Sequence, residues 1–388
     1  MKTKRGRLIG VSLLSLILLL IIGVLLFLIF SGDSVETLEI EEEPIEEYEE
    51  YEEPIEEEPE EEEPPIEEPE IPKKEYPQPE YAFKEESVII EIPGMKEEFT
   101  YAWVSDVHLI TDIEEGDVDE EFLATLQQRY ETLPVTDDGV HAKDLWPEIV
   151  KYLNYNYGEG NIDAVLFGGD LLDYYSPKNM EYFETYFKQL DVPYVYIRAD
   201  HDYGAFYGAS ESEAYQRHDQ LDDDSWEEKY IEEEDFIILG INGSTKDIPE
   251  ERLPYLEEMF AKEKPIIIMT HVPYEAKVET PDIEESLEEL SMRVRNKIYY
   301  WGGGSYKPND KTKQYFNMLY ADDTPVVQVL AGHMHEKWEG LITEQVQQHI
   351  FTPAFKGTIG IVHIVPDEYS EKEELKDNIF NSISSNNP

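Results

Sequence analysis

The sequence predicts an α/β fold, an α+β layered domain of packed sheets and helices, on the basis of two observations. Short apolar runs typical of buried strands alternate with longer amphipathic stretches typical of helices. Five short polar motifs also occur, and each directly follows one of the apolar runs. Ligands of layered α/β folds bind beyond the carboxyl ends of the strands, so the second observation predicts one shared functional site.

The strand and helix predictions cover residues 85–366, which we expect to form a single domain. The predicted strands are Val88–Ile92, Thr100–Val104, Ala164–Phe167, Tyr194–Ile197, Phe236–Ile241, Ile266–Met269, Val326–Leu330, His349–Phe351 and Ile359–Val365. The predicted helices are Glu120–Tyr130, Leu145–Tyr155, Asn179–Leu190, Leu253–Ala261 and Thr312–Tyr320. The last two strands are close together in the sequence, which indicates a partly antiparallel sheet.

The N-terminal segment has the pattern of a membrane anchor. Residues 1–7 are a basic tail, and Leu8–Phe30 follows with 23 uncharged residues. A helix of this length spans a bilayer, and basic flanks stay in the cytoplasm. We therefore expect a single-pass signal anchor in the cell membrane, with the following domain outside the cytoplasm. The alternative is a cleaved signal peptide, although its apolar region is normally shorter.

Residues 31–84 are predicted to be a disordered acidic linker. They repeat glutamate-rich blocks closed by proline, and residues 31–80 hold 24 acidic and two basic residues. Repulsion between like charges and the lack of a core oppose folding of such a segment. Residues 367–388 are expected to be a polar C-terminal tail.

Charge and composition exclude several functions. The net charge is −57, and the domain is acidic even without the linker. Binding to long nucleic acid normally requires a basic surface, so long nucleic acid is not expected as a substrate. The chain contains no cysteine, which excludes disulfides and thiol catalysis. Protein partners cannot be inferred from the sequence.

The five motifs carry carboxylate and imidazole groups suited to divalent metals. They are Asp106-Val107-His108, Gly168-Gly169-Asp170, Asp200-His201-Asp202, Thr270-His271 and Gly332-His333-Met334-His335. Asp106 and His108 are two residues apart, so in an extended segment they would share one face. A carboxylate such as that of Asp170 can bridge two metals ~3.5–4 Å apart. The motifs therefore predict a two-metal phosphoester hydrolase.

With these motifs in this order, the chain from about Phe99 to Val365 resembles the calcineurin-like metallophosphoesterase superfamily. The family pattern is Asp-x-His, Gly-Asp-x-x-Asp, Gly-Asn-His-Asp/Glu, a lone His and Gly-His-x-His. The resemblance implies a four-layer α-β-β-α sandwich holding two divalent metal ions, which would be manganese, iron or zinc. It also implies hydrolysis of phosphomonoesters or phosphodiesters by a metal-bridging hydroxide.

The resemblance further implies a role for each motif residue. The implied ligands of the first metal are Asp106, His108 and His335, with Asp170 as the bridge, and those of the second metal are His271, His333 and Asp200. His201 would protonate the leaving group or bind the phosphate, and Asp173 would orient His201. Asp202 would support the loop.

The chain departs from the family pattern at Ala199-Asp200, where Gly-Asn is usual. The extra carboxylate of Asp200 should hold the metals more tightly and make them weaker Lewis acids. This change is the argument for the alternative function, a catalytically degenerate surface binding module.

Two further features are candidates for substrate binding. Tyr203 is a candidate for stacking on the substrate, and the loop Trp301–Tyr306 either lines the pocket or lies at the surface. Four histidines have no ligand spacing and are predicted to be structural: His141, His218, His349 and His363.

Overall fold

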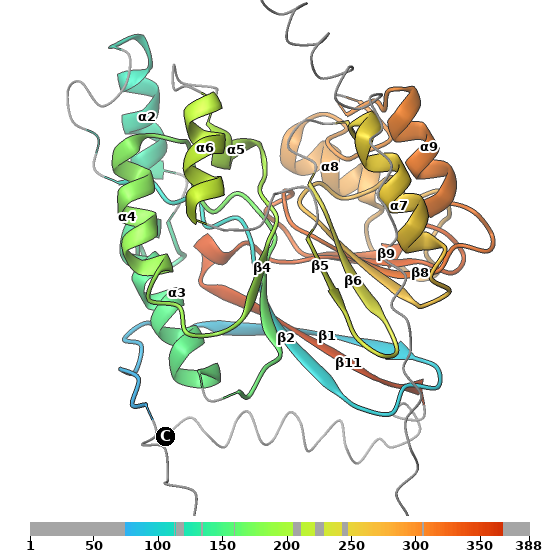
Figure 1. Ribbon diagram of the computed structural model, residues 1–388. Helices are drawn as coiled ribbons and strands as arrows, with labels where there is room; N and C mark the ends of the chain where they lie inside the picture. The colour runs from blue at the N-terminus through green and yellow to red at the C-terminus, as the bar shows by residue number, and fades with distance from the viewer. Residues whose placement is uncertain are drawn as a thin grey trace, which may run out of the picture. The chain divides into compact units, whose positions relative to one another are not determined.

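Two mixed β-sheets form the centre of the computed structural model (Figure 1). The described residues are 74–111, 113, 120–132, 135–158, 160–204, 211–221, 229–242, 247–304 and 306–367. Within them, no helix is long and apolar enough to cross a bilayer. Leu8–Phe30, residues 31–73 of the acidic linker and residues 368–388 lie outside the described residues, so the predictions made for these segments stay predictions.

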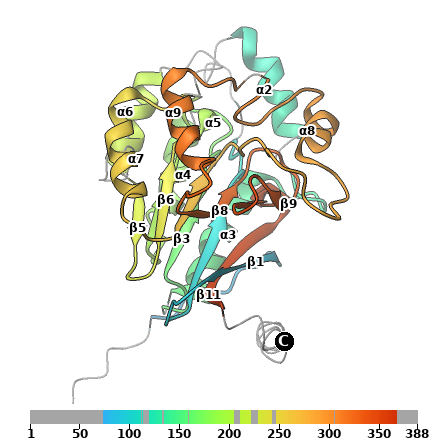
Figure 2. The same cartoon turned by 90° about the vertical axis from the view of Figure 1, so that its right-hand side faces the viewer.

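The first sheet has the strand order β1-β11-β2-β3-β4. Its strands are β1 (Lys84–Ile92), β2 (Phe99–Val104), β3 (Ala164–Phe167), β4 (Tyr194–Tyr196) and β11 (Thr358–Pro366). β1 and β11 run parallel and side by side in both views (Figures 1 and 2). β11 is antiparallel to β2, whereas β2, β3 and β4 are parallel to one another.

The second sheet has the order β5-β6-β7-β8-β10-β9. Its strands are β5 (Tyr230–Glu232), β6 (Ile237–Ile241), β7 (Ile266–Thr270), β8 (Val326–Ala331), β9 (Trp338–Leu341) and β10 (Gln347–Ile350). The four inner strands are parallel, and the two edge strands are antiparallel to their neighbours.

Eight α-helices accompany the strands in the described part of the chain. They are α2 (Glu120–Thr132), α3 (Ala142–Tyr157), α4 (Pro177–Phe187), α5 (Asp200–Tyr203), α6 (Glu211–Leu221), α7 (Leu253–Phe260), α8 (Leu287–Arg295) and α9 (Asp310–Leu319). Local signals set several of these boundaries. The Ser176 side chain caps α4 directly before Pro177, and Ser286 with Glu289 forms a capping box at the start of α8.

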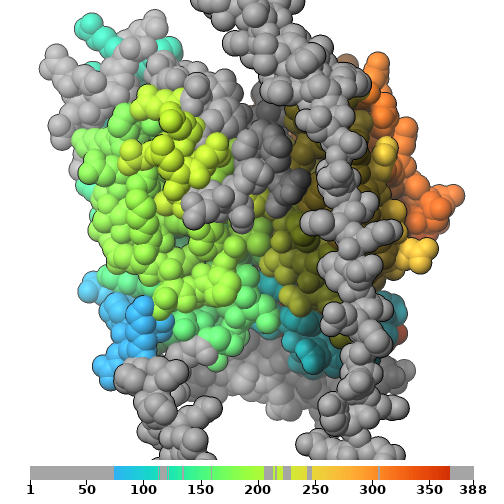
Figure 3. All heavy atoms as spheres, viewed as in Figure 1, coloured from blue at the N-terminus to red at the C-terminus, as the bar shows by residue number. Residues whose placement is uncertain are grey.

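Alternating side chains of the strands divide the core into layers. In β2, Tyr101 and Trp103 join the apolar cluster between the two sheets, while Ala102 and Val104 join the cluster under α3 and α4. The outer face of the second sheet packs in the same way against α7 and α9. The layer order is therefore helix, sheet, sheet, helix. The space-filling view shows the green elements on one side and the yellow-to-orange elements on the other (Figure 3).

All nine predicted strands and all five predicted helices exist, most of them with shifted ends. Two strands were missed, β5 and β9, because they are short edge strands without an apolar run. The closeness of the last two predicted strands was the wrong reason to expect antiparallel pairing, because β10 and β11 lie in different sheets. The antiparallel pairs are β2 with β11, β5 with β6 and β9 with β10. Contacts of the domain also begin before Glu85, since the ring of Tyr81 packs on the core and its N–H donates to Glu148.

Candidate metal centre

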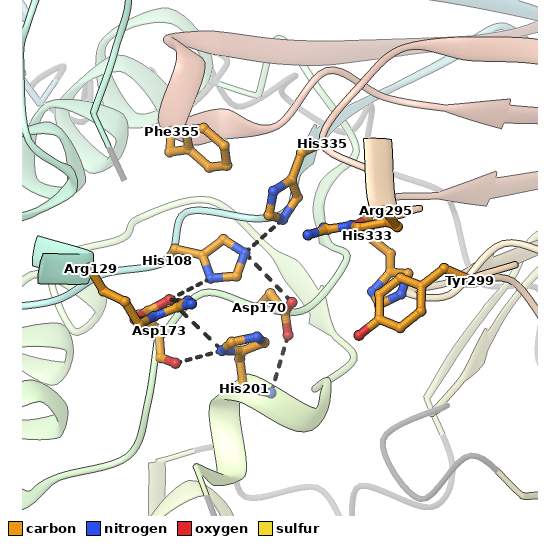
Figure 4. Close-up of a pocket in the computed structure, with 10 residues that line it drawn as sticks. All are labelled: His108, Arg129, Asp170, Asp173, His201, Arg295, Tyr299, His333, His335 and Phe355. Atoms are coloured by element: carbon orange, nitrogen blue, oxygen red, sulfur yellow. Dashed lines mark hydrogen bonds and ion pairs between the residues drawn. The ribbon is translucent and has the colours of Figure 1, made fainter. Parts of the chain in front are cut away.

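The five motifs follow β2, β3, β4, β7 and β8, and their side chains meet at one place. Figure 4 shows the motif side chains that line the pocket: His108, Asp170, His201, His333 and His335. Five non-glycine motif residues have left-handed backbone angles: Asp106 at φ 52°, His108 at 48°, Asp170 at 53°, His333 at 70° and His335 at 60°. This conformation costs roughly 1–3 kcal/mol per residue and is concentrated at functional sites. The expectation that Asp106 and His108 lie on an extended segment is therefore wrong, because tight turns bring them together.

Backbone hydrogen bonds hold these turns against each other. The N–H of Asp106 donates to the carbonyl of Gly169 over 3.0 Å, and the N–H of His108 donates to the carbonyl of Asp170 over 3.0 Å. Gly332 is required next to them, because a Cβ at this position would overlap the Asp106 carboxylate. The N–H of His333 can then donate to Asp106 over 3.0 Å.

Asp202 ties two motif loops together. Its carboxylate is fully buried and accepts four backbone N–H bonds of 2.8–3.0 Å, from Asp170, Leu171, Leu172 and Ala199. Burial and the neighbouring Asp170 carboxylate raise the pKa of Asp202 to about 6, although the N–H donors act in the opposite direction. The expectation that Asp202 supports the loop is thus consistent with its contacts.

Candidate ligand atoms form three groups, in each of which the atoms lie within 4.8 Å of one another. The groups are Asp106 with His108 and His335, Asp170 with His271 and His333, and His108 with Asp170 and His201. The first two are the sets implied by the sequence, apart from Asp200. Asp170 is shared, because its Oδ2 lies 2.9 Å from His271 Nε2 and 3.6 Å from His108 Nε2.

Most of the spacings between these atoms fit metal ligation, although Nε2 of His108 and Oδ1 of Asp106 are 3.9 Å apart. Two ligand atoms bound to one ion at ~2.1 Å lie about 3.0–3.4 Å apart in tetrahedral or octahedral geometry. In the first group, Nε2 of His108 and Nε2 of His335 are 3.0 Å apart, and the latter is 3.4 Å from Oδ1 of Asp106. In the second group, Nδ1 of His333 and Nε2 of His271 are 3.2 Å apart. The donor set thus suits two divalent cations.

The charges of the site also favour cation binding. Burial would raise the pKa of Asp170, but His271 and the other nearby histidines outweigh it and hold that pKa well below its usual range. Burial lowers the pKa of His335 to about 4, and burial together with His271 lowers the pKa of His333. These imidazoles are neutral near pH 7 and so have lone pairs for a metal.

His271 behaves differently, because burial alone would lower its pKa, yet Asp170 and Asp106 raise it to about 10. A metal must displace this proton before it can bind the imidazole. Asp200 is half-buried and lies outside the three ligand groups. Its negative charge nevertheless contributes to raising the pKa of His271 and that of His201.

Asp173 makes different contacts from those expected. Its carboxylate accepts a hydrogen bond from His108 Nδ1 over 3.0 Å and a two-pronged ion pair from Arg129 of α2. His201 instead binds the backbone carbonyl of Asp173, through Nδ1 over 2.6 Å. The Asp173 side chain therefore orients His108, and the backbone of the same residue orients His201. The carboxylate itself is 3.8 Å from His201.

The motif side chains open into a pocket of about 90 Å³ (Figure 4). Its lining residues are His108, Arg129, Asp170, Asp173, His201, Arg295, Tyr299, His333, His335 and Phe355. Sequence reasoning missed Arg129, Arg295, Tyr299 and Phe355. Arg129 lies in a predicted helix, but its position there gave no functional signal. Arg295 ends α8, which was not predicted at all.

The candidate substrate residues outside the motifs need correction. Tyr203 is 2% exposed, packs in the apolar core and does not line the pocket, so the prediction that it stacks on a substrate is wrong. The short helix α5 turns its side chain away from His201 and into the space beside His218. The loop Trp301–Tyr306 is not simply a surface loop, because Trp301 and Tyr306 are buried and the Tyr306 ring lies 5.6 Å from that of His333.

The histidines without ligand spacing have structural surroundings. His218 is buried and binds the carbonyl of Asp202 through Nε2, while His349 lies between Glu86 and Glu339. The ring of His141 stacks on Tyr130, and His363 lies beside the Thr100 hydroxyl. None of the four belongs to a ligand group in the described part of the chain.

The layered fold with a buried carboxylate and imidazole cluster defines a candidate metallohydrolase. A family model of the calcineurin-like phosphoesterases matches residues 99–337, more than half of the chain. The chain therefore belongs to this family, and it is a metal-dependent hydrolase that acts on phosphoric ester bonds.

Two solved structures resemble the chain at low identity. For a dimetal phosphatase from Danio rerio the identity is 12%, the match covers 66% of this chain and 88% of that chain, and the TM-score is 0.36. For a cold-active protein-tyrosine phosphatase of a psychrophilic Shewanella species the identity is 12%, the coverage is 70% and 73%, and the TM-score is 0.22. No curated protein matches the chain.

Proposed function

We propose that the chain is a membrane-anchored, outward-facing phosphoesterase that uses two divalent metal ions to hydrolyse small phosphomonoesters or phosphodiesters. The observation that carries the proposal is the pair of three-residue ligand groups that share the space around Asp170. Asp106, His108 and His335 would hold one ion, and His271 and His333 the other. Asp170 would touch both ions, and Asp200 would add charge to the second.

Two bound cations would supply a hydroxide nucleophile at neutral pH and would stabilise charge on the phosphoryl oxygens. The residues of the chain have complementary roles. A backbone carbonyl can only accept a hydrogen bond, so the contact with Asp173 places a proton on Nδ1 of His201. Nε2 of His201 is then the atom that exchanges a proton with the leaving group or donates to the phosphoryl group.

The electrostatic surroundings of His201 support this role. Burial would lower its pKa, but the carboxylates of Asp170 and Asp173 outweigh it and raise that pKa above the usual value. A histidine that keeps its proton near neutral pH can serve as a general acid. His201 also lines the pocket, so its side chain can reach a bound substrate.

The chemical proposal is tested with the full-length chain in detergent and manganese added. We expect bound metal together with hydrolysis of aryl phosphomonoester or diester substrates, and loss of the hydrolysis after chelation. Metal binding without hydrolysis of any of a panel of monoesters, diesters and nucleotides would favour the degenerate binding module.

The location is a separate proposal, supported by the basic residues before Leu8, the apolar run Leu8–Phe30 and the acidic segment behind it. Protease added to intact cells should cut the acidic linker and release a soluble, active domain. Protection of the domain until the membrane is lysed would contradict the proposed orientation and leave the chemistry unaffected.

A further inference from the structure

Arg295 is a cation in the pocket wall that the proposed chemistry has not used. It is the last residue of α8, and it lines the pocket together with His333 and His335. In the close-up its guanidinium points towards the middle of the pocket, on the side opposite Arg129 (Figure 4). The two arginines therefore face the same space from different elements, α2 and α8.

The charges of the two arginines are balanced differently. The guanidinium of Arg129 is paired with the Asp173 carboxylate through two hydrogen bonds. Arg295 has no carboxylate within ion-pair distance among the described residues. Its positive charge consequently remains available to an anion that enters the pocket.

Three contacts fix the position of the Arg295 side chain. Nη2 donates to the carbonyl of His333 over 2.8 Å, and the guanidinium carbon lies 5.4 Å from the centre of the Tyr299 ring. Nε is buried and has no hydrogen-bond partner in the described part of the chain, which is an energetic cost. Nη1 makes no hydrogen bond to the described residues, so its N–H groups are left for the pocket.

The number of phosphoryl oxygens decides what such a donor can bind. A phosphodiester has two non-bridging oxygens, and two metal ions can engage both of them. A phosphomonoester has a third non-bridging oxygen and a second negative charge. A guanidinium close to the metal ligands is suited to that third oxygen, because arginine N–H groups match phosphate geometry.

We propose that Arg295 binds a terminal, non-bridging phosphoryl oxygen and thereby gives the site a preference for phosphomonoesters over phosphodiesters. This inference rests on the proposed phosphoesterase function and names the substrate class. The carboxylate of Asp200 acts in the opposite direction, because its charge repels a doubly charged ester. The positive charge of Arg295 in the pocket wall offsets that repulsion.

The test compares the full-length wild type with Arg295→Gln, Arg295→Lys and the control Arg293→Gln. Arg293 lies on the same helix, but its guanidinium is exposed and paired with Glu285. Metal content is measured first. Catalytic efficiency is then measured with manganese on an aryl phosphomonoester and a diester that share the same leaving group, and binding of inorganic phosphate is measured by titration calorimetry.

We expect Arg295→Gln to lower the efficiency on the monoester by about tenfold or more, the effect of one charged hydrogen bond, and that on the diester by less than about threefold. Phosphate binding should weaken about as much as the monoester efficiency, while metal content stays unchanged. The monoester efficiency of Arg295→Lys should lie between those of the wild type and Arg295→Gln, because lysine keeps the charge but lacks the planar guanidinium. The control should match the wild type.

An equal fall on both esters, or unchanged phosphate binding, would overturn the proposal. Loss of metal in both Arg295 variants would overturn it too, because the residue would then only hold the His333 turn. A wild type that hydrolyses neither ester but binds phosphate through Arg295 would contradict the phosphoesterase function and leave the anion site standing. Hydrolysis of both esters by the wild type, with the same ratio of efficiencies in Arg295→Gln, would support the phosphoesterase function and contradict the proposed role of Arg295.

Discussion

Replacement of Asp202 with asparagine should weaken both the fold and the metal centre. The Asp202 carboxylate accepts N–H bonds from the turn that presents Asp170 and from the start of α5. Each carboxylate oxygen accepts two of these bonds: Oδ1 from Leu171 and Leu172, and Oδ2 from Asp170 and Ala199. An asparagine has only one acceptor oxygen, so two of the four donors would face an N–H₂ group.

The magnitude follows from the number of donors that lose their acceptor. The site is fully buried, so water cannot replace the lost oxygen. Each buried N–H without a partner costs about 1–3 kcal/mol, which gives a loss of about 2–6 kcal/mol for two. The total free energy of unfolding of a domain is about 5–15 kcal/mol, so this loss is a large share of it.

Chemical denaturation of wild type and Asp202→Asn, with metal removed by chelation, measures this loss in the free energy of unfolding. Asp310→Asn is the matched control, because the Asp310 side chain is 93% exposed and pairs with Lys313 at the surface. It should change stability by less than about 0.5 kcal/mol. A change of the same small size for Asp202→Asn would refute the reasoning that the carboxylate holds the two turns together.

Three further predictions concern the metals and the substrate. Asp200→Asn should raise activity on aryl monoesters relative to matched diesters and should lower metal affinity; an unchanged ratio with saturating metal would remove the electrostatic account of Asp200. Asp173→Asn should lower metal affinity by about 10- to 100-fold, because His108 loses the carboxylate that orients it, and it should move the alkaline limb of the pH–rate profile to lower pH, because the Asp173 charge no longer raises the pKa of His201; an unmoved limb would contradict the role of His201 as the general acid. Metal affinity should also rise with pH by up to about tenfold per unit until near pH 10, since the metal displaces a proton from His271; a chelator competition that gives a flat profile would contradict the raised pKa of this residue.

The sequence allowed the positions of the metal-ligand candidates to be predicted because strand ends and motifs coincide. Buried parallel strands such as β3 and β7 are continuous apolar runs, and the polar residue that follows each run has to lie at the edge of a sheet. Asp170 and His271 could therefore be placed in one site before the structure was known. The same argument placed His333 after β8.

The remaining parts of the site depend on tertiary contacts that have no local signature. Arg129 and Arg295 are ordinary basic residues near helix C-termini, and only packing turns them towards the pocket. The position of Tyr203 was mispredicted because one short helix decides on which side its ring packs. Asp173 does contact His201 as expected, but through its backbone carbonyl instead of its carboxylate, and a contact through the backbone leaves no trace in the sequence.

The measurement that tests the account most directly is the metal content of wild type and Asp170→Asn, determined by elemental analysis together with turnover. His363→Ala is the control, because His363 lies on β11 beside Thr100 and outside the ligand groups. We predict two divalent ions per chain and turnover in the wild type and the control, and loss of both in Asp170→Asn. Near wild-type metal content and rate in Asp170→Asn would contradict a two-metal centre around this carboxylate.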